Sequence, residues 1–544
     1  MTLATDLATH SRSSSERTYS LFDKKKRIIA ELREAWGHSS DRRRNFERIG
    51  LYHHLARTHG EEATVDDQTW VDLNLDDVFA KIDRTITSLG SQYLYHLLHT
   101  YEEDETILRR RSELCGLFMK NSEFRESVQV ILTKLNQRDG YSLPKILLGD
   151  IPDRPRWYWI IYILSALSIL SLVITFFHPA IFWIALGMAL INITLNFRFG
   201  SRSLAYFSDL SSLSTLLRVA DVLAEPKQAG TEYPFESLRK HRALARSLNR
   251  KIGWLILDSS RMDTLSATFV EYLNQFCLFN LVAWMRTSHS IRQWQSELRQ
   301  IFDAVAALDT SIAVASYLTE AKCFCAPCFT KSSVIDFSDV THPLVENPVP
   351  NSITLDKKSC LVTGSNMAGK TTFVKTLGVN VILAQTLHFC LATKASVPKL
   401  FVKSSINRSD DINNRKSRYF QEIETVLKFT KLGSAPHQYL FIIDEIFSGT
   451  NTVERISAAA SVLDYLGKNN VTLVTTHDLE LQELLRSRYV VYHFTEQVVG
   501  NRHFFDYKLK AGPCLTRNAI KLLGLLGYPS EIIRRSNALA RKLS

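Results

Sequence analysis

The chain has 544 residues, of which 66 are Lys or Arg and 55 are Asp or Glu, and its formal net charge is +11. This length exceeds what one hydrophobic core usually serves, so we expect three or four structural units. The hydrophobic share of 45% excludes a wholly disordered chain. The positive balance fits a polyanionic partner, either nucleic acid or anionic lipid headgroups, but also fits a merely solvated basic surface.

The first 65 residues form a polar and basic region. Its first twenty residues are rich in Ser and Thr and contain no apolar core of a secretory signal, so we expect a partly disordered segment. Short basic clusters at 24–27, 42–44 and 109–111 favour binding to a polyanion.

Helical periodicity dominates the next part of the chain. Apolar residues recur every three or four positions through 66–150 and again through 204–330, which predicts the two halves of a helical core. The apolar stretch Gln275–Met285 is too short to cross a bilayer, and we interpret it as a core helix.

Between these two halves lies a run without Asp, Glu, Lys or Arg, from Trp157 to Phe197. The run divides at His178-Pro179 into two apolar segments of about twenty residues each, the length that a hydrocarbon core requires. Proline suits the first position of a helix, where its missing N–H costs nothing. We predict a transmembrane hairpin over 151–203, with spans of about 157–177 and 179–197.

Arginines flank both outer ends of the hairpin, namely Arg154, Arg156, Arg198 and Arg202. By the positive-inside rule, we expect a membrane location with the C-terminal domain and both termini in the cytoplasm. The alternative is a hairpin buried in a soluble helical core. We favour the membrane because a soluble helix needs a polar side wherever it meets water.

Strand-like runs that alternate with helices begin in the region 331–544, which predicts a mostly parallel α/β domain. The sequence GSNMAGKT satisfies the phosphate-loop pattern G-x-x-x-x-G-K-[ST] between a strand and a helix. Backbone N–H groups of such a loop surround phosphates, its lysine reaches the β- and γ-phosphates, and its hydroxyl holds Mg²⁺. The predicted ATP-binding residues are Gly364, Ser365, Asn366, Met367, Ala368, Gly369, Lys370, Thr371 and Thr372.

Two later strands end in candidate catalytic groups. YLFIIDE ends in Asp444, which we expect to hold Mg²⁺ together with Thr371, and in Glu445, which we expect to act as general base. VTLVTTHD ends in His477, which could sense the γ-phosphate or orient the attacking water. Because no N-K-x-D guanine pattern follows, adenine is the expected base.

Three cysteines, Cys323, Cys325 and Cys328, lie close together in CFCAPC. A closed zinc site needs a fourth ligand, and no CxxC or HxxxH partner follows nearby, so buried or loop cysteines are the preferred interpretation.

Several segments together resemble the ATPase domain of the MutS mismatch-repair family. The resemblance rests on TGSNMAGKTTFVKT, SRYFQEIETV, DEIFSGTNTVE and TTHD in that order, with THPLVENP upstream and GYPSEIIRRSNALARKL downstream. It implies an Mg²⁺-dependent ATPase that works as a homodimer, in which Ser417 reaches the nucleotide of the partner subunit. It also implies DNA binding and a role in mismatch repair. The segment Ile82–Leu98 resembles the start of that family's helical core.

The departures from the family pattern concern DNA reading and the ATP site. The region before Trp70 is too short for a mismatch-reading domain and its Phe-x-Glu wedge, and the hairpin stands where the family's DNA clamp would interrupt the core. Phe447 and Ser448 replace a Gly and a basic residue, and the segment ENPVPNSITL shows no aromatic residue to stack on adenine.

These observations lead to a membrane-anchored MutS-like ATPase as the first hypothesis. The competing hypotheses are a transporter of the ABC type and a membrane scaffold whose nucleotide only locks its assembly, with protein partners that the sequence does not identify. The absence of an L-S-G-G-Q segment between the phosphate loop and Asp444, and the presence of only two spans, disfavour the transporter.

Overall fold

The structure of the chain is a computed structural model. It describes residues 23–39, 42–57, 64–136, 140–151, 157–225, 233–253, 268, 272–273, 275–365, 368–406, 418–434, 436–447, 450–499, 502–513 and 527–543. The chain divides into two compact units. The first, which we call the helical unit, comprises 1–62, 82–96 and 113–320. The second, which we call the sheet unit, comprises 63–81, 97–112 and 321–544.

The helical unit is built from helices throughout its described residues, as its periodicity predicted. They are α2 (Phe46–Ile49), α3 (Leu51–Arg57), most of α6 (Ser88–His99), α8 (Ser122–Asn136), α9 (Leu143–Leu148), α12 (Phe235–Gly253), α14 (Phe279–Gln293) and α15 (Gln295–Glu320). Helix α7 (Glu105–Lys120) begins in the sheet unit and ends here. Helix α15 is long and apolar enough to cross a membrane, but 94% of its most apolar stretch is buried inside the protein, so it is the core helix of this unit.

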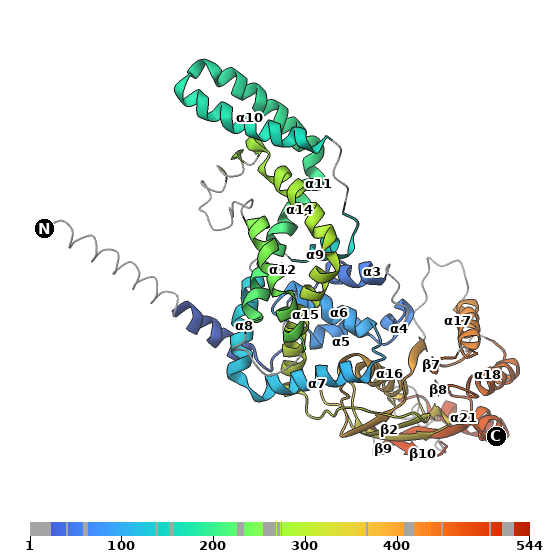
Figure 1. Cartoon of the computed structure of the whole chain (residues 1–544). Coiled ribbons are helices and arrows are strands. Elements are labelled where there is room, and N and C mark those ends of the chain that lie inside the picture. Colours follow the sequence, from blue (N-terminus) through green and yellow to red (C-terminus); the bar gives the residue numbers. More distant parts are fainter. Residues whose placement is uncertain are drawn as a thin grey trace. The chain divides into compact units, whose positions relative to one another are not determined.

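The charge-free run forms two antiparallel helices, α10 (Tyr158–Phe177) and α11 (Phe182–Leu223), which Figure 1 shows as a hairpin. Pro179 is the first residue of the 3₁₀ turn η1 (Pro179–Ile181) that joins them. Helix α11 does not end near residue 197, where the sequence changes from apolar to polar. The helix is 42 residues long in all and runs without interruption from Phe182 to Leu223 in the helical unit. The hairpin and the core therefore share one continuous helix.

A buried carboxylate joins α15 to the start of α6. Asp309 is fully buried and accepts hydrogen bonds from the backbone N–H groups of Ile86 and Thr87, at 3.0 and 2.8 Å, and from the Thr87 hydroxyl at 2.6 Å. A Cβ atom on Gly90 would lie 2.4 Å from the Asp309 carboxylate, so only glycine fits there. Burial raises the pKa of Asp309 to about 6, because the charged form loses hydration.

Two of the three basic clusters are at least partly used inside the molecule. Arg42 and Arg44 both pair with the buried carboxylate of Asp83. Arg111 pairs with Glu102 at 3.1 Å and donates to the carbonyl of Thr386 at 2.8 Å. These guanidinium groups stabilise the fold, because a buried carboxylate without a cation would be costly. The expectation that these clusters serve a polyanion is therefore weakened by the structure.

The sheet unit contains two sheets in its described residues. The larger one has the strand order β10-β9-β4-β8-β7-β6, with parallel pairing from β9 to β6 and antiparallel pairing between β10 and β9. Its strands are β4 (Ser359–Thr363), β6 (Phe401–Ser405), β7 (Tyr439–Asp444), β8 (Val471–Thr475), β9 (Tyr489–Val499) and β10 (Arg502–Ala511). The smaller sheet has the order β1-β5-β2-β3, with β1 (Cys328–Phe329), β2 (Val334–Val340), β3 (Asn351–Asp356) and β5 (Lys394–Val397). The mostly parallel sheet expected from the sequence is present.

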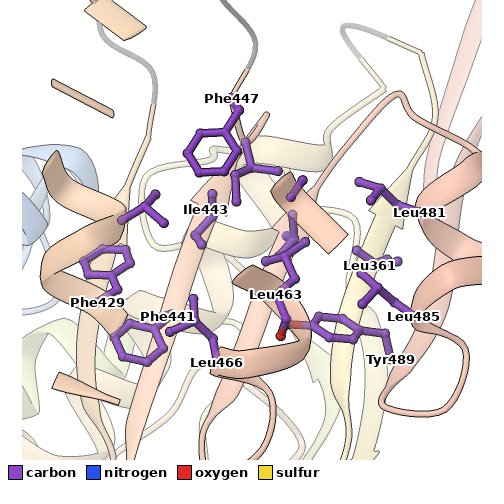
Figure 2. Packing of buried hydrophobic residues seen from close by; sticks show 14 of the residues in the cluster. Leu361, Phe429, Phe441, Ile443, Phe447, Leu463, Leu466, Leu481, Leu485 and Tyr489 are labelled. Carbon is purple, nitrogen blue, oxygen red and sulfur yellow. The ribbon is translucent and has the colours of Figure 1, made fainter. Parts of the chain in front are cut away.

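Helices connect the parallel strands. They are α16 (Lys370–Leu387) after β4, α17 (Arg418–Leu432) before β7, α18 (Thr452–Leu466) after β7 and α19 (Glu480–Leu485) after β8, and α21 (Ser530–Leu543) follows near the C-terminus. Figure 2 shows the apolar cluster that α17 to α19 form with β7, with Phe441, Leu463 and Leu466 buried completely. The mostly apolar β7 and the fully buried β8 suit strands covered on both faces.

Two stretches that the sequence placed in the helical core belong to the sheet unit. They carry α4 (Asp67–Asp72), most of α5 (Leu75–Ile82) and the chain around Tyr101. Asp66 pairs with Lys403 at 2.8 Å, and the Ser404 hydroxyl donates to Asp72 at 2.9 Å, so α4 is fixed to β6. Trp70 stacks on His99 with ring centroids 3.4 Å apart. These contacts join residues far apart in the chain, which periodicity cannot reveal.

Replacing Asp309 with asparagine is expected to remove a pH dependence of stability. The folded pKa of about 6 lies above the unfolded value of 3.8, so the folded protein keeps a proton that the unfolded chain releases, and the free energy of unfolding falls as pH rises from about 4 to 6. A shift of about two pKa units corresponds to at most about 3 kcal/mol. Thermal unfolding in detergent at pH 4.5 and 7 measures this loss of stability for the wild type, Asp309→Asn and the exposed control Glu236→Gln. If Asp309→Asn lost as much stability between the two pH values as the wild type, Asp309 would not be the group responsible.

Candidate functional site

The candidate site lies at the carboxyl ends of three neighbouring parallel strands, β4, β8 and β7. The loop after β4 contains Gly364, β7 ends at Asp444, and β8 is followed closely by His477. Asp444 is in register with Thr475 on β8, and Val362 on β4 is in register with the same residue. Because parallel strands end at one edge of a sheet, three distant segments deliver their polar groups to one place.

The phosphate loop depends on glycine at two positions. Gly364 has φ +135°, and a Cβ atom there would lie 2.5 Å from the carbonyl oxygen of Phe494, so a side chain is excluded by both conformation and space. Gly369 has φ +99° and is the N-cap of α16, so the N–H groups of the first turn, which have no partner within the helix, face the loop. Such a helix start attracts an anion.

The lysine of the loop is held by backbone carbonyls. The Lys370 side chain is buried, and its ammonium group donates to the carbonyl of Gly364 at 2.8 Å and to that of Ser365 at 3.1 Å. Nε2 of His477 lies 3.3 Å from the same nitrogen. The buried ammonium group of Lys370, next to the N–H groups at the start of α16, favours the binding of an anion beside the phosphate loop.

Oxygen ligands meet beside the lysine. The Thr371 hydroxyl lies 3.2 and 3.1 Å from the two carboxylate oxygens of Asp444, and the Thr475 hydroxyl also donates to Asp444. Magnesium prefers hydroxyl and carboxylate oxygens of this kind, and it usually keeps several waters beside one or two protein ligands. The donor set predicted from the sequence, Thr371 with Asp444, is therefore brought together in the structure and fits Mg²⁺.

The acidic residue after Asp444 faces the histidine. Oε1 of Glu445 lies 3.1 Å from Nε2 of His477, and the Glu445 N–H donates to the Thr475 carbonyl at 3.1 Å. Glu445 has φ +57°, a left-handed conformation that few non-glycine residues adopt. This backbone turn directs the carboxylate to the site, as strained residues at functional sites often do.

An ion pair holds the loop that carries His477. Arg455 near the start of α18 contacts both oxygens of Asp478, at 2.6 and 3.1 Å, and both side chains are largely buried. The Asp478 N–H also donates to the Thr476 hydroxyl at 3.0 Å. The chain on either side of His477 is therefore fixed, which restricts the positions that its ring can take.

The residue Phe447, which stands where the resembling family has glycine, keeps the glycine-like backbone. It has φ +58° and is buried against the ring of Tyr419 in α17, with centroids 6.4 Å apart. Figure 2 shows it at the end of the apolar cluster. Burial of a phenyl ring, worth about 2 to 3 kcal/mol, offsets the roughly 1 kcal/mol of strain at this turn.

A cavity of about 550 Å³ adjoins the loop. Its polar lining includes Ser365, Lys370, Thr371, Thr372 and Glu445, each of which the sequence predicted as a site residue. Its apolar and aromatic lining consists of Val340, Val345, Pro348, Val349, Phe373, Phe494 and Tyr507. A cavity that combines charged, polar and aromatic groups suits a phosphorylated ligand that carries a flat ring.

Sequence reasoning missed the aromatic side of this cavity. Tyr507 is 45% exposed and lines the cavity from β10, and its ring carbon Cδ1 would lie 3.4 Å from a Cβ on Gly369. The side-chain amide of Asn351 donates to the Tyr507 carbonyl at 3.0 Å and accepts from the Leu509 N–H at 2.8 Å, which fixes this part of β10. No local motif could have revealed Tyr507, because it follows the loop by well over a hundred residues.

His342, within the quoted segment THPLVENP, also lines the cavity. Burial, together with the nearby Lys375 and Lys81, lowers its pKa to about 4, so the ring is neutral at physiological pH. Its Nδ1 accepts from the Leu344 N–H at 3.2 Å, which leaves the proton on Nε2. That Nε2 is buried and has no hydrogen-bond partner in the described part of the chain.

Other predicted residues have different outcomes. Ala368 is buried behind the loop, whereas Asn366, Met367 and Ser417 lie outside the described residues. Cys323 and Cys325 are half-buried and Cys328 is exposed, and no group of three metal-ligating side chains occurs among the described residues.

Comparison with known proteins places these features in a family context. Residues 360–544 match the family model described as MutS domain V. The DNA mismatch repair protein MutS of Anaeromyxobacter sp. (strain Fw109-5) is 31% identical over 271 residues, covering 45% of this chain and 30% of the relative. The protein of the same name from Carboxydothermus hydrogenoformans is 32% identical over 260 residues, covering 45% and 31%, and that from Thermus aquaticus is 30% identical over 209 residues, covering 37% and 25%.

The match is confined to part of each protein. The matched segments cover less than a third of the length of these MutS relatives. The C-terminal part of the chain is thus of the MutS domain V type, a phosphate-loop ATPase domain, as its motifs indicated. The mismatch-repair activity in the relatives' names belongs to those longer proteins.

Replacing Tyr507 with alanine is expected to weaken nucleotide binding. Stacking of a base on an aromatic ring contributes about 1 to 3 kcal/mol, so the Kd for ATP should rise roughly 5- to 100-fold. The substitution Tyr507→Phe should keep the affinity, and Tyr528→Ala, which changes an exposed tyrosine outside the cavity, is the control. Equilibrium binding of a fluorescent ATP analogue measures all three. Equal affinities of Tyr507→Ala and the wild type would remove Tyr507 from the base site.

Proposed function

We propose that the chain binds and hydrolyses MgATP, acts as a MutS-like dimer, and is anchored in a membrane through the α10–α11 hairpin. The observation that carries the ATPase part is the meeting of Lys370, Thr371, Asp444, Glu445 and His477 at one edge of the sheet, beside a glycine-rich helix start. The match to MutS domain V supports the same activity.

The residues of the site have distinct tasks in this proposal. The N–H groups at the start of α16 and Lys370 bind the phosphates, and Thr371 and Asp444 would hold Mg²⁺, which when bound neutralises phosphate charge. Tyr507 and the apolar residues of the lining receive the adenine ring in this proposal. Each task uses a group that the cavity already presents.

Glu445 is the general base in this mechanism. Its carboxylate accepts a proton from the attacking water as the water oxygen bonds to the γ-phosphorus and the bond from that phosphorus to the β–γ bridging oxygen breaks, so that ADP leaves. His477, 3.1 Å away, orients the carboxylate and lies within reach of Lys370. The Arg455–Asp478 pair keeps the His477 loop in place during this step. The arrangement leaves hydrolysis, rather than phosphate transfer to a side chain, as the supported reaction.

The substitution Glu445→Gln is expected to separate binding from hydrolysis. The amide keeps the shape of the side chain but is a very weak base, so ATP binding should persist while kcat falls about 100-fold or more. Glu483→Gln, on an exposed face of α19, is the control. Steady-state phosphate release and equilibrium binding are measured in parallel. A wild type that binds ATP without turnover would support the scaffold hypothesis instead.

The dimer and the DNA-binding role rest on the resemblance to MutS. In that arrangement Ser417, just before α17, would reach the nucleotide of the partner subunit. DNA binding is proposed because the relatives are named DNA mismatch repair proteins. In the described part of the chain, one candidate for phosphate contacts is α12, where Arg239, Lys240, Arg250 and Lys251 are exposed.

If α12 contacts duplex DNA, affinity should depend strongly on salt. Neutralising even two phosphates predicts a loss of at least about tenfold in affinity between 50 and 200 mM salt. The double variant Arg239→Glu/Lys240→Glu should lower affinity and flatten this dependence, while Glu236→Gln on the same helix should not. Gel-shift titrations of the detergent-solubilised protein test it. Salt-independent or undetectable binding would refute DNA as a partner.

The hairpin has the distribution of side chains expected in lipid. Most of the buried residues of the hairpin are small or polar, namely Ser165, Ser168 and Ser171 on α10 and Ala185, Ala189 and Asn192 on α11, and Ile161 on α10 is the large apolar exception. The large apolar residues face outward, including Leu170, Val173, Phe176, Trp183, Ile184 and Leu190, each more than half exposed. A soluble core has the reverse order, whereas membrane helices pack through small residues. This favours the bilayer over a buried soluble hairpin.

Membrane anchoring predicts that the protein resists extraction from membranes by alkaline carbonate. Placing arginines at the exposed positions Leu170 and Val173 should release it, because each costs about 2.5 to 3.5 kcal/mol at mid-bilayer, while Leu484→Arg on α19 should not. The measurement is the fraction of protein in the pellet after carbonate treatment. Release of the wild-type protein would refute the anchor.

A further inference from the structure

Helix α14 and the residues just before it pack against both helices of the hairpin. Figure 1 shows α14 running from the base of the hairpin into the helical unit. Cys277, Leu278 and Leu281 are almost fully buried, at 1–3% exposure. The sequence suggested an ordinary core helix here, because Gln275–Met285 is too short to cross a bilayer. The structure instead places the beginning of this segment beside the charge-free hairpin.

One buried polar side chain joins the three segments. Asn192 on α11 is completely buried, and its Nδ2 donates to the Ser168 hydroxyl on α10 and to the backbone carbonyl of Phe276, each at 2.6 Å. Phe276 lies in a short helical stretch just before α14, and Leu278 between the two has φ +56°, which interrupts the helix. In a lipid environment a backbone carbonyl beside such a break must be paired by protein, and Asn192 pairs that of Phe276.

Helix geometry gives the depth of this contact. Ser168 lies nine residues before the end of α10 at Phe177, or about 14 Å along the helix. Asn192 lies ten residues after the start of α11 at Phe182, or about 15 Å. Since a hydrocarbon core is about 30 Å thick, a hairpin that spans it places Ser168, Asn192 and the Phe276 carbonyl near its centre.

The segment from Phe276 onward is apolar and about as long as half the thickness of the hydrocarbon core. From Phe276 to Met285 the chain carries no Asp, Glu, Lys or Arg, and the first charged residue is the exposed Arg286. The part of α14 from Phe279 to Met285 spans about 10 Å, and with the three residues before it the segment reaches roughly 15 Å, the distance from the bilayer centre to its surface. The absence of charge, the length of the segment and its contact with Asn192 all fit a segment that runs from the bilayer centre to the surface.

We propose that residues 276–285 form a re-entrant half-helix that enters the inner leaflet beside the hairpin and is held there by Asn192. The inserted part of the protein then consists of three segments, and the acyl chains of the bilayer cover the outer side of α14. This inference rests on the proposed membrane anchor, and its test is chosen so that the two can fail separately.

The test uses photo-crosslinking from three aromatic positions of the full-length protein in phospholipid vesicles. Benzoylphenylalanine replaces Phe279 in the proposed half-helix, Phe176 near the hairpin tip, which is 87% exposed, or Tyr465 on α18, which is 46% exposed. Covalent adducts with phospholipid acyl chains are identified by mass spectrometry. We expect lipid adducts at 176 and 279 and none at 465.

The outcomes distinguish the two proposals. Lipid adducts at 176 without any at 279, or adducts at 279 only with another protein chain, would overturn the re-entrant half-helix while leaving the anchor. Absence of lipid adducts at both 176 and 279 would overturn the anchor itself.

A second comparison tests the role of Asn192. Asn192→Leu removes both hydrogen bonds, so the yield of lipid adducts at 279 should fall at least severalfold while the yield at 176 is kept. Thr194→Val is the matched control, because the Thr194 hydroxyl bonds only the Leu190 carbonyl of its own helix, at 2.7 Å. Equal yields at 279 in Asn192→Leu and Thr194→Val would show that Asn192 does not hold the segment.

Discussion

The parallel pairing of β4 with β8 and of β8 with β7 is the constraint on which the candidate site depends. It places the ends of three strands side by side, so that the phosphate loop, Asp444 and the chain before His477 meet although more than a hundred residues separate the first from the last. The apolar strands allow this pairing because helices cover them on both faces. The hydrogen bonds from Thr371 and Thr475 to Asp444 then link all three strand ends directly.

In the core of the helical unit, a buried carboxylate likewise joins segments that are distant in the chain. Asp309 on α15 binds the first backbone N–H groups of α6, and Gly90 leaves the space that this carboxylate needs. A helix start that would otherwise have unpaired donors is thereby fixed to the core helix. Since α11 runs from the hairpin tip into this unit as one helix, a movement of the hairpin is transmitted into the unit by a rigid element. Coupling of membrane and nucleotide would begin along this path in the proposed function.

The hairpin and the turn after β7 show how side-chain size can reverse an expectation. In the hairpin, most buried residues are small or polar and most large apolar residues are exposed, the reverse of a soluble core. After β7, Phe447 adopts a backbone conformation that favours glycine, because its ring fills the end of an apolar cluster against Tyr419. In both places the surroundings, rather than local preference, decide which residue is tolerated.

The sequence by itself determined the local features. The phosphate loop, the acidic end of β7, the two apolar helices and the proline turn between them follow from patterns within about twenty residues, because backbone geometry and helix periodicity act over that range. Tertiary structure decided what depends on distant segments meeting: Tyr507 and His342 on the cavity wall, α4 on β6, the internal pairing of Arg42 and Arg44 with Asp83, and the carbonyl of Phe276 on Asn192. Such contacts join residues from tens to hundreds of positions apart, and no local pattern carries information about them.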